Sequence, residues 1–212
     1  MNISIITEKN GWFVKCINTL IDDLKARQHN INIIHNHQDV PYGDILFALG
    51  YYRLIPTKIM ERNHHNIVIH ESDLPLGRGW SPLSWQVLEG KTEIVFSLFE
   101  MSEKVDDGDI YFKRILKLDG TELCDDLRRK QAQKKSEMCL EFIDCYPNII
   151  QQAQKQVGTS TLYKKRDAKS SKLDTYETIA EQFNLLRIVD NYNYPAYFEY
   201  HGVEYKIHIY KK

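Results

Sequence analysis

Short apolar runs alternate with segments of helical periodicity through the first half of the chain. Runs of aliphatic residues are typical of strands buried in a parallel sheet, and the segments between them predict crossover helices. The predicted strands are residues 3–6, 31–34, 44–50 and 66–70, and the predicted helices are residues 13–28 and 56–62. This alternation indicates an α/β fold: a Rossmann-like, mostly parallel twisted sheet with helices on both faces.

The second half of the chain predicts fewer sheet strands and longer helices. Ser81 as N-cap and Pro82 in the first turn predict a helix that ends at Gly90. Further predicted elements are strands at 93–101 and 109–118, a helix at 121–146, a connecting loop at 156–174, a helix at 176–190 and a hairpin that turns at residues 201–202. We therefore expect a catalytic domain at 1–155, followed by a small subdomain at 156–212 with a C-terminal helix and β-hairpin.

Composition narrows the function classes. The chain has 212 residues and a net charge of −1, so it lacks the basic excess typical of nucleic-acid binding. Its four cysteines form no CxxC pair, and the histidines of HNH (35–37) and HH (64–65) have no cysteine or acidic ligand at metal spacing, so no metal site is expected. No segment has the length of a membrane span, and a cytoplasmic protein without a membrane partner is predicted.

One titratable residue interrupts the apolar pattern. His70 ends the predicted strand 66–70, and strand ends are where ligands bind in open α/β sheets. A core histidine bonded to a backbone carbonyl is the alternative. The turn VDDGD supplies Asp106 and Asp107 before Gly108, and a carboxylate from this turn can hold one nitrogen of an imidazole while the other faces a reacting atom.

Several stretches resemble one known family. IVIHESDLPLGRG (67–79) is similar to the NxHPSxLPxxRG signature of formyltransferases that use 10-formyltetrahydrofolate, and VDDGDI (105–110) resembles their later D-x-G turn. FALGYYRLIP (47–56) is similar to their pterin-loop segment. The continuation GWSPLSWQVLEGKTEI and the tail from Ser171 resemble bacterial enzymes that N-formylate nucleotide-linked amino sugars.

The resemblance implies a direct, metal-free transfer of a formyl group from 10-formyltetrahydrofolate to the amine of a nucleotide-linked amino sugar, for surface glycan biosynthesis. His70 would stabilise the oxyanion and carry a proton, and Asp106 would orient it. The family asparagine two residues before the histidine is Val68 here. Asn66 shares that strand face and is the candidate substitute, with a structural role, Ser72 or an ordered water as alternatives.

The resemblance also implies two pterin loops, whose candidate residues are Leu49, Gly50, Tyr51, Arg53, Ile55, Ser102 and Val105. A surface ion pair is the alternative role for Arg53. Candidates for the acceptor site are Asn10 and Trp12 after the first strand, Arg78 and Gly79 of the signature, and the polar residues Arg187, Asp190 and Asn191. For the last three, a structural ion pair that anchors the tail is the alternative.

The same resemblance is compatible with three other functions: formyltetrahydrofolate hydrolysis, methionyl-tRNA formylation, and non-catalytic folate or nucleotide binding. Turnover without an acceptor distinguishes the hydrolase, and the absence of a basic excess argues against tRNA. Tyrosines along the C-terminal hairpin offer an edge that could pair in a homodimer.

Overall fold

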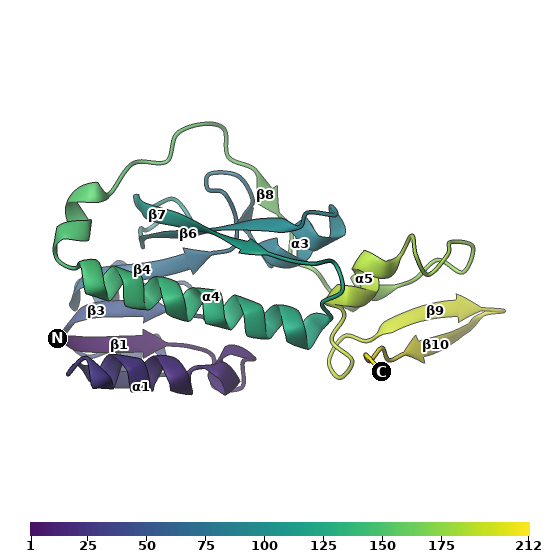
Figure 1. Ribbon diagram of the computed structural model, residues 1–212, viewed down its shortest axis with the longest axis horizontal. Coiled ribbons are helices and arrows are strands. Elements are labelled where there is room, and N and C mark those ends of the chain that lie inside the picture. The colour runs from purple at the N-terminus through teal and green to yellow at the C-terminus, as the bar shows by residue number, and fades with distance from the viewer.

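The computed structural model describes all residues from 1 to 212, and its centre is a six-stranded sheet (Figure 1). The strand order is β2–β1–β3–β4–β6–β7. The strands are β1 (Asn2–Ile6), β2 (Asn30–Ile34), β3 (Gly43–Ala48), β4 (Asn63–His70), β6 (Glu93–Glu100) and β7 (Ile110–Lys117). The first four are mutually parallel, and β6 runs antiparallel to both of its neighbours. The predicted mostly parallel α/β fold is therefore confirmed.

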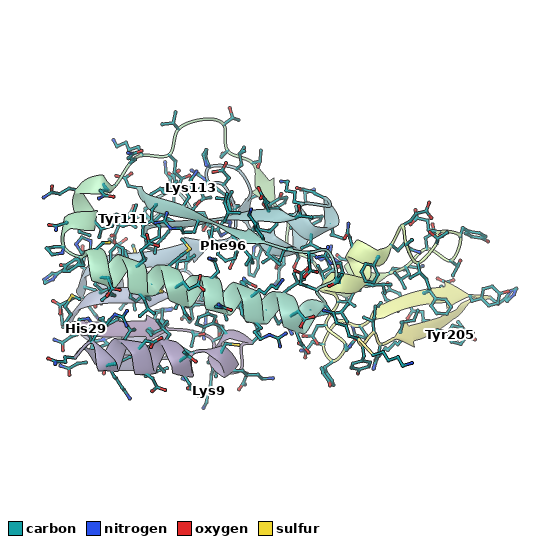
Figure 2. All side chains as sticks on the ribbon, in the orientation of Figure 1. Lys9, His29, Phe96, Tyr111, Lys113 and Tyr205 are labelled. Atoms are coloured by element: carbon teal, nitrogen blue, oxygen red, sulfur yellow. The ribbon has the colours of Figure 1, made fainter.

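Two helices cover one face of this sheet. The helices α1 (Asn18–Ala26) and α4 (Cys124–Cys145) lie side by side along the strands in Figure 1. Their apolar faces enclose the larger core, which includes Phe47, Phe96 and Phe142; Figure 2 labels Phe96 just above the α4 ribbon. The opposite face carries a smaller cluster around α2 (Thr57–Met60), while α3 (Pro82–Leu88) adds Leu83 and Val87 to the larger core.

Some predicted helices are wrong in extent. The segment 13–28 divides into a 3-10 turn (Phe13–Cys16) and α1. Only α5 (Phe183–Ile188) forms within 176–190, because the Gln182 side chain bonds the backbone of Asp174 in both directions and holds the preceding residues in turns. Ser81 precedes α3 as predicted but has a left-handed φ of 48° and makes no capping hydrogen bond.

The segment after α4 returns to the residues that follow β4. The short strand β8 (Leu162–Tyr163) pairs in parallel with β5 (Arg78–Gly79), so the prediction of a plain connecting loop at 156–174 is wrong there. Figure 1 shows this segment passing over the sheet before the chain reaches α5. The remaining 3-10 turns are His37–Asp39, Asn148–Gln152 and Ala168–Ser171.

The C-terminal hairpin is confirmed. Strands β9 (Ala196–Tyr200) and β10 (Val203–Ile207) pair in antiparallel fashion, and His201 and Gly202 have the positive φ values that a two-residue hairpin turn requires. The hairpin projects away from the sheet in Figure 1 and packs on a small cluster of Leu173, Leu186, Val189 and Ala196. The domain boundary at residue 155 stays a prediction. None of the helices combines the length and apolar character needed to cross a bilayer.

Candidate active site

The structure brings His70 and Asp106 together. Nδ1 of His70 lies 3.7 Å from Oδ1 of Asp106, and the two side chains are 8% and 12% exposed. This distance allows an electrostatic interaction but exceeds that of a hydrogen bond. His70 ends β4, as its sequence context predicts, and Asp106 comes from the turn between β6 and β7.

The tautomer of His70 is set by a backbone carbonyl. Its Nε2 lies 2.8 Å from the carbonyl oxygen of Gly77, which can only accept, so Nε2 carries a hydrogen and donates it. In the neutral ring the lone pair is then on Nδ1 and faces Asp106. Sequence reasoning assigned this orienting role to the carboxylate. The structure gives it to Gly77, because the 70–79 loop folds back over the ring.

The turn that carries Asp106 is tightly constrained. Asp106 has a left-handed φ of 52°, and its Oδ2 accepts a 2.9 Å hydrogen bond from the amide of Gly79. A Cβ on Gly108 would lie 1.6 Å from the carbonyl oxygen of Glu100, so only glycine fits against the sheet at this point. This requirement explains the glycine of the DDGD sequence.

His70 and Asp106 can both accept hydrogen bonds from the same donor. A neutral Nδ1 and an ionised carboxylate are both acceptors, and they face each other across a gap wider than a hydrogen bond. A donor with more than one N–H, such as an amine, can satisfy both groups at once. The arrangement is therefore suited to accepting a proton from a nitrogen nucleophile.

Two loops present unused backbone donors. The amides of residues 50–55 and 102–108 donate to no acceptor within the protein. Thr57, the first residue of α2 after the loop 50–55, donates from its Oγ1 to Glu103 at 3.0 Å and so connects that end of the first loop to the second. Such free N–H groups suit the acceptor atoms of a planar heterocycle, which is the recognition implied for the pterin.

The individual pterin-loop candidates have different environments. Leu49 and Ile55 are buried, and Gly50 has a positive φ and lies close to Phe13. The Tyr51 hydroxyl bonds Nδ1 of His37 at 2.9 Å. Arg53 makes a bidentate pair with Glu8, so the alternative of a surface ion pair describes its environment.

The other two candidates of these loops lie near the surface. Ser102 donates to the carbonyl of Lys104, and Val105 is 53% exposed.

The Asn66 amide is used elsewhere. Its Nδ2 donates to the carbonyl of Met60 at 3.0 Å, so the side chain holds the end of α2 against β4, and the structural alternative fits better than an oxyanion role. The Val68 side chain supplies no donor. Ser72 is buried, and its hydroxyl has no hydrogen-bond partner in the protein, so the alternative of a Ser72 donor stays open.

Arg78 and Gly79 support the site from behind. Arg78 donates to Gln156 and pairs with Asp107, and Gly79 donates to Asp106. Sequence reasoning directed these residues toward the acceptor and missed Gln156, which lies fifty residues from Asp106 in a polar segment without a recognisable motif.

Aromatic side chains gather beside the loop of residues 50–55. The Trp12 indole donates to the Tyr52 hydroxyl at 3.2 Å, and the rings of Tyr52 and Trp80 stack with centroids 6.2 Å apart. The Lys165 ammonium lies 4.6 Å from the Trp80 ring centroid. Asn10 is exposed in the turn before Trp12. We call Trp12, Tyr52 and Trp80 the aromatic group.

Arg187, Asp190 and Asn191 anchor the tail. Arg187 is 3% exposed and donates to Glu122, while Asp190 pairs with Arg128 at 2.8 Å. Burial alone would raise the pKa of Asp190, but hydrogen bonds from Asn193, Tyr192 and Arg128 hold the pKa well below its usual range.

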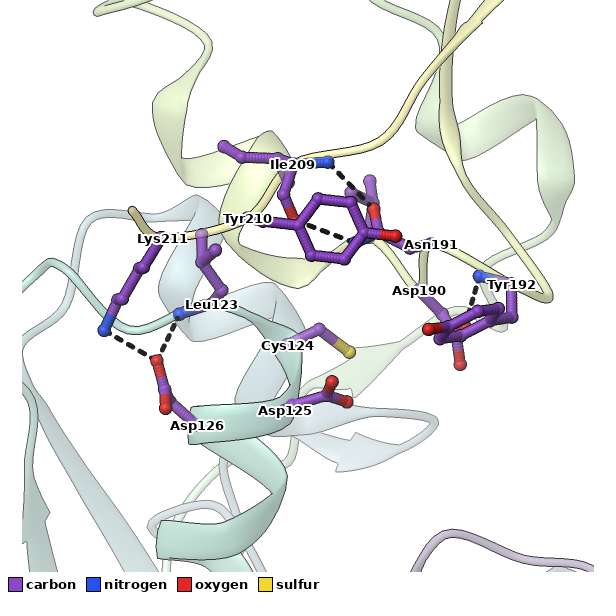
Figure 3. A pocket seen from close by; sticks show the side chains of 11 residues that line it. Leu123, Cys124, Asp125, Asp126, Asp190, Asn191, Tyr192, Ile209, Tyr210 and Lys211 are labelled. Atoms are coloured by element: carbon purple, nitrogen blue, oxygen red, sulfur yellow. Dashed lines mark hydrogen bonds and ion pairs between the residues drawn. The ribbon is translucent and has the colours of Figure 1, made fainter.

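Figure 3 shows where Asp190 and Asn191 lie. Asn191 bonds the backbone of Ile209 beside a 190 Å³ pocket at the start of α4. The structural alternative fits all three residues.

A buried ion pair lies directly behind His70. Lys135 of α4 contacts Glu71 at 2.5 Å, and both side chains are 7% exposed. Burial would raise the pKa of Glu71, but the positive charge of Lys135 and hydrogen bonds from Lys135 and Gln131 lower it overall. A lowered pKa means that the ionised form stabilises the fold above the ordinary glutamate pKa of about 4.3, and this stabilisation is lost as the pH falls below it.

Replacing Lys135 by methionine is expected to lower the free energy of unfolding by about 3–5 kcal/mol, because Glu71 would remain buried without its partner. The matched double variant, with Glu71 and Lys135 both changed to methionine, is expected to recover most of this loss. Urea unfolding at neutral pH measures both. Equal stability of the single variant and the wild type would contradict the role of the pair.

Comparisons with known proteins identify the family of this chain. Residues 22–143 match the family model described as formyl transferase. A methionyl-tRNA formyltransferase from Ehrlichia canis (strain Jake) is 28% identical over 149 residues, which cover 70% of this chain and 46% of the relative. The chain thus aligns with about half the length of that curated relative.

Solved structures share the fold. A methionyl-tRNA formyltransferase from Clostridium thermocellum superposes with a TM-score of 0.81 at 24% identity, covering 96% of this chain and 90% of the other. A sugar N-formyltransferase from Shewanella sp FDAARGOS_354 gives a TM-score of 0.71 at 16% identity, covering 100% and 98%. HypX from Aquifex aeolicus in complex with tetrahydrofolic acid gives 0.75 at 18% identity, covering 95% and 36%.

The family model covers more than half of the chain, including the His70 strand and the Asp106 turn. The chain therefore belongs to the formyl transferase family.

Proposed function

We propose that this protein is a cytoplasmic N-formyltransferase that moves a formyl group from 10-formyltetrahydrofolate to the amine of a nucleotide-linked amino sugar, a step in surface glycan biosynthesis. The single observation that carries the proposal is the facing pair of His70 Nδ1 and the Asp106 carboxylate, because it can accept a proton from an attacking amine.

The folate is supported by the two loops with free amides. Residues 50–55 and 102–108 offer N–H groups that no protein atom uses, and the linked loops suit a flat ring between them. The structurally similar HypX from Aquifex aeolicus is in complex with tetrahydrofolic acid. The proposed reaction requires no metal ion.

In the proposed mechanism the neutral amine attacks the formyl carbon, and a C–N bond forms as the carbonyl oxygen becomes an oxyanion. His70 Nδ1 takes the proton that the amine loses, and Asp106 stabilises the resulting imidazolium. The imidazolium then stabilises the oxyanion. It next returns its proton to N10 of the folate as the C–N10 bond breaks, which leaves a formamide and tetrahydrofolate. Val68 cannot add an amide donor, so His70 carries more of this charge stabilisation than in relatives with asparagine.

The aromatic group supports a nucleotide on the acceptor. Trp12, Tyr52 and Trp80 come from three separate loops, and Lys165 beside Trp80 adds a positive charge for a diphosphate. Asn10 lies at the same edge. Arg187, Asp190 and Asn191 are left out of this proposed site because they anchor the tail.

Changing Trp12 to alanine is expected to raise the KM for the nucleotide sugar roughly tenfold, since base stacking contributes about 1–3 kcal/mol, with little change in kcat. Initial rates at varied acceptor concentration measure this. Trp85, which packs on Tyr163 of β8, provides a matched tryptophan outside the aromatic group. A larger KM effect in Trp85→Phe than in Trp12→Ala would contradict the assignment.

Mass spectrometry tests the activity. The purified protein, 10-formyltetrahydrofolate and a panel of nucleotide-linked 4-amino sugars are expected to yield one sugar with a single added formyl group. No gain across the panel would contradict the proposed acceptor.

Methionyl-tRNA is a second candidate acceptor, because the Ehrlichia canis and Clostridium thermocellum proteins carry that activity in their names. The net charge of −1 disfavours it, since binding to a phosphate backbone relies on basic side chains. A parallel assay with methionyl-tRNA distinguishes the two acceptors.

Two further outcomes separate the remaining functions. Formate release without an acceptor would indicate a hydrolase, and ligand binding without turnover would indicate a non-catalytic module.

We also propose that the hairpin edge at β10, which is unpaired in the chain, joins a second copy in a homodimer; sedimentation equilibrium measures this.

A further inference from the structure

We propose that the segment 156–166, here called the strap, holds the catalytic pair in its working geometry, with Thr161 and Gln156 as positioning residues. This inference rests on the proposed function and extends the site to a part of the chain beyond the matched family region. No side chain of the strap contacts the imidazole of His70 or the carboxylate of Asp106. The strap acts through the loop of residues 77–79 and, at Gln156, through the backbone of the Asp106 turn.

The loop 77–79 connects both catalytic groups. The carbonyl of Gly77 accepts from His70 Nε2 at 2.8 Å, and the amide of Gly79 donates to Asp106 Oδ2 at 2.9 Å. A shift of this loop would therefore change the tautomer and direction of the imidazole and the position of the carboxylate together.

The strap determines where that loop lies. Thr161 Oγ1 accepts the amide hydrogen of Gly77 at 2.8 Å, and the Thr161 carbonyl accepts from Arg78 at 2.9 Å. The Tyr163 carbonyl accepts from Trp80 at 3.1 Å. These three hydrogen bonds attach residues 77–80 to residues 161–163, and the two that join backbone groups belong to the parallel β5–β8 pairing.

Close packing makes the attachment specific. A Cβ on Gly77 would lie 2.7 Å from the Tyr163 ring, and one on Gly79 would lie 2.6 Å from the Tyr163 carbonyl oxygen. The glycines of the LGRG stretch therefore leave room for the strap. Tyr163 is itself fixed by stacking on Trp85 and by a hydrogen bond from its hydroxyl to Glu89.

Gln156 fixes the other side of the pair. Its Nε2 donates to the carbonyls of Asp106 at 2.9 Å and Gly108 at 3.0 Å, while its Oε1 accepts from Arg78 at 2.6 Å. The left-handed conformation of Asp106 costs free energy and persists only when its surroundings enforce it. Gln156 supplies that enforcement and connects the Asp106 turn to the loop 77–79.

The experiment compares Thr161→Val with Ser160→Ala, since the first removes the acceptor of the Gly77 amide and the second alters an exposed neighbour. We expect Thr161→Val to lower kcat roughly ten- to a hundredfold with the folate KM within about twofold, because small misplacement of reacting groups has effects of this size. Thr161→Ser keeps the hydroxyl and is expected to restore the rate. Wild-type kcat in Thr161→Val, or an equal loss in Ser160→Ala, would overturn the proposal.

A second variant and a measurement without substrate keep the test independent of the proposed function. Gln156→Leu should lower kcat without raising the KM of either substrate. In ¹⁵N-histidine NMR, wild-type His70 should be the Nε2–H tautomer, and Thr161→Val should populate the Nδ1–H form. A wild-type His70 in the Nδ1–H form, or spectra of His70 that do not change in Thr161→Val, would refute the strap's role even if formyl transfer is confirmed. If instead both NMR results hold and no formyl transfer occurs, only the proposed function fails.

Discussion

Changing His70 to glutamine is expected to lower kcat/KM for formyl transfer by about 10²–10⁴-fold, the range typical of a lost general acid–base. Glutamine can still donate to the Gly77 carbonyl from its side-chain amide, so the loop 77–79 keeps its anchor. What it lacks is the basic Nδ1 that faces Asp106. Steady-state rates with saturating 10-formyltetrahydrofolate measure the loss.

The control for this variant is His64→Gln on the same strand. The His64 side chain is 71% exposed and pairs with Asp44 away from the site, so its rate should equal that of the wild type. Folate affinity of the His70 variant, measured by fluorescence quenching, should remain within about threefold, because the pterin loops do not depend on the imidazole. A fully active His70→Gln protein would contradict the mechanism.

The Asp106→Asn variant should show a second large effect, a fall in kcat of about 10²-fold with little change in either KM. The asparagine oxygen can still accept from the Gly79 amide. The variant loses the negative charge beside the imidazolium, and its new N–H₂ can donate to Nδ1 and block the base.

Asp109→Asn is the matched control for that variant. Asp109 flanks the same glycine, but its carbonyl rather than its side chain takes part in the turn by accepting from Glu100. The two variants separate the charge at residue 106 from the acidity of the turn as a whole. Equal losses of kcat in both would argue against a specific role for Asp106.

Local sequence patterns were sufficient to predict many of the helices and strands. β4 could be predicted because its aliphatic run contains the buried Ile67 and Ile69, and the β9–β10 hairpin because its alternation and its His-Gly turn agree. The proximity of His70 and Asp106 could be predicted because the family resemblance implied it, whereas their spacing in the sequence alone does not.

Other features depend on contacts between distant residues. Gln156 and Thr161 lie in a polar segment whose role exists only where it meets the loop 77–79. The sequence alone could not show whether Arg187 binds substrate or stabilises the fold. Its buried partner Glu122, which precedes α4, shows that the role is structural. Glu71 offered one available signal: an acid directly after a buried strand usually requires a buried partner.

The helix predicted at 176–190 failed for a related reason. Its apolar spacing is helical, but the Gln182 side chain satisfies the backbone of Asp174 in a compact turn and leaves only six residues for α5. Side chains that bond nearby backbone groups compete with helix formation in a way that periodicity does not report.

The central claim is that the protein transfers a formyl group, rather than hydrolysing or only binding the folate, at a site where an imidazole and a carboxylate accept the proton of the acceptor amine. The ratio of the two products in a single reaction tests this claim most directly. Tetrahydrofolate and formylated sugar should appear in equal amounts, and neither should form when the acceptor is omitted. Folate consumption that proceeds at the same rate without an amino sugar, or none under any condition, would contradict this account.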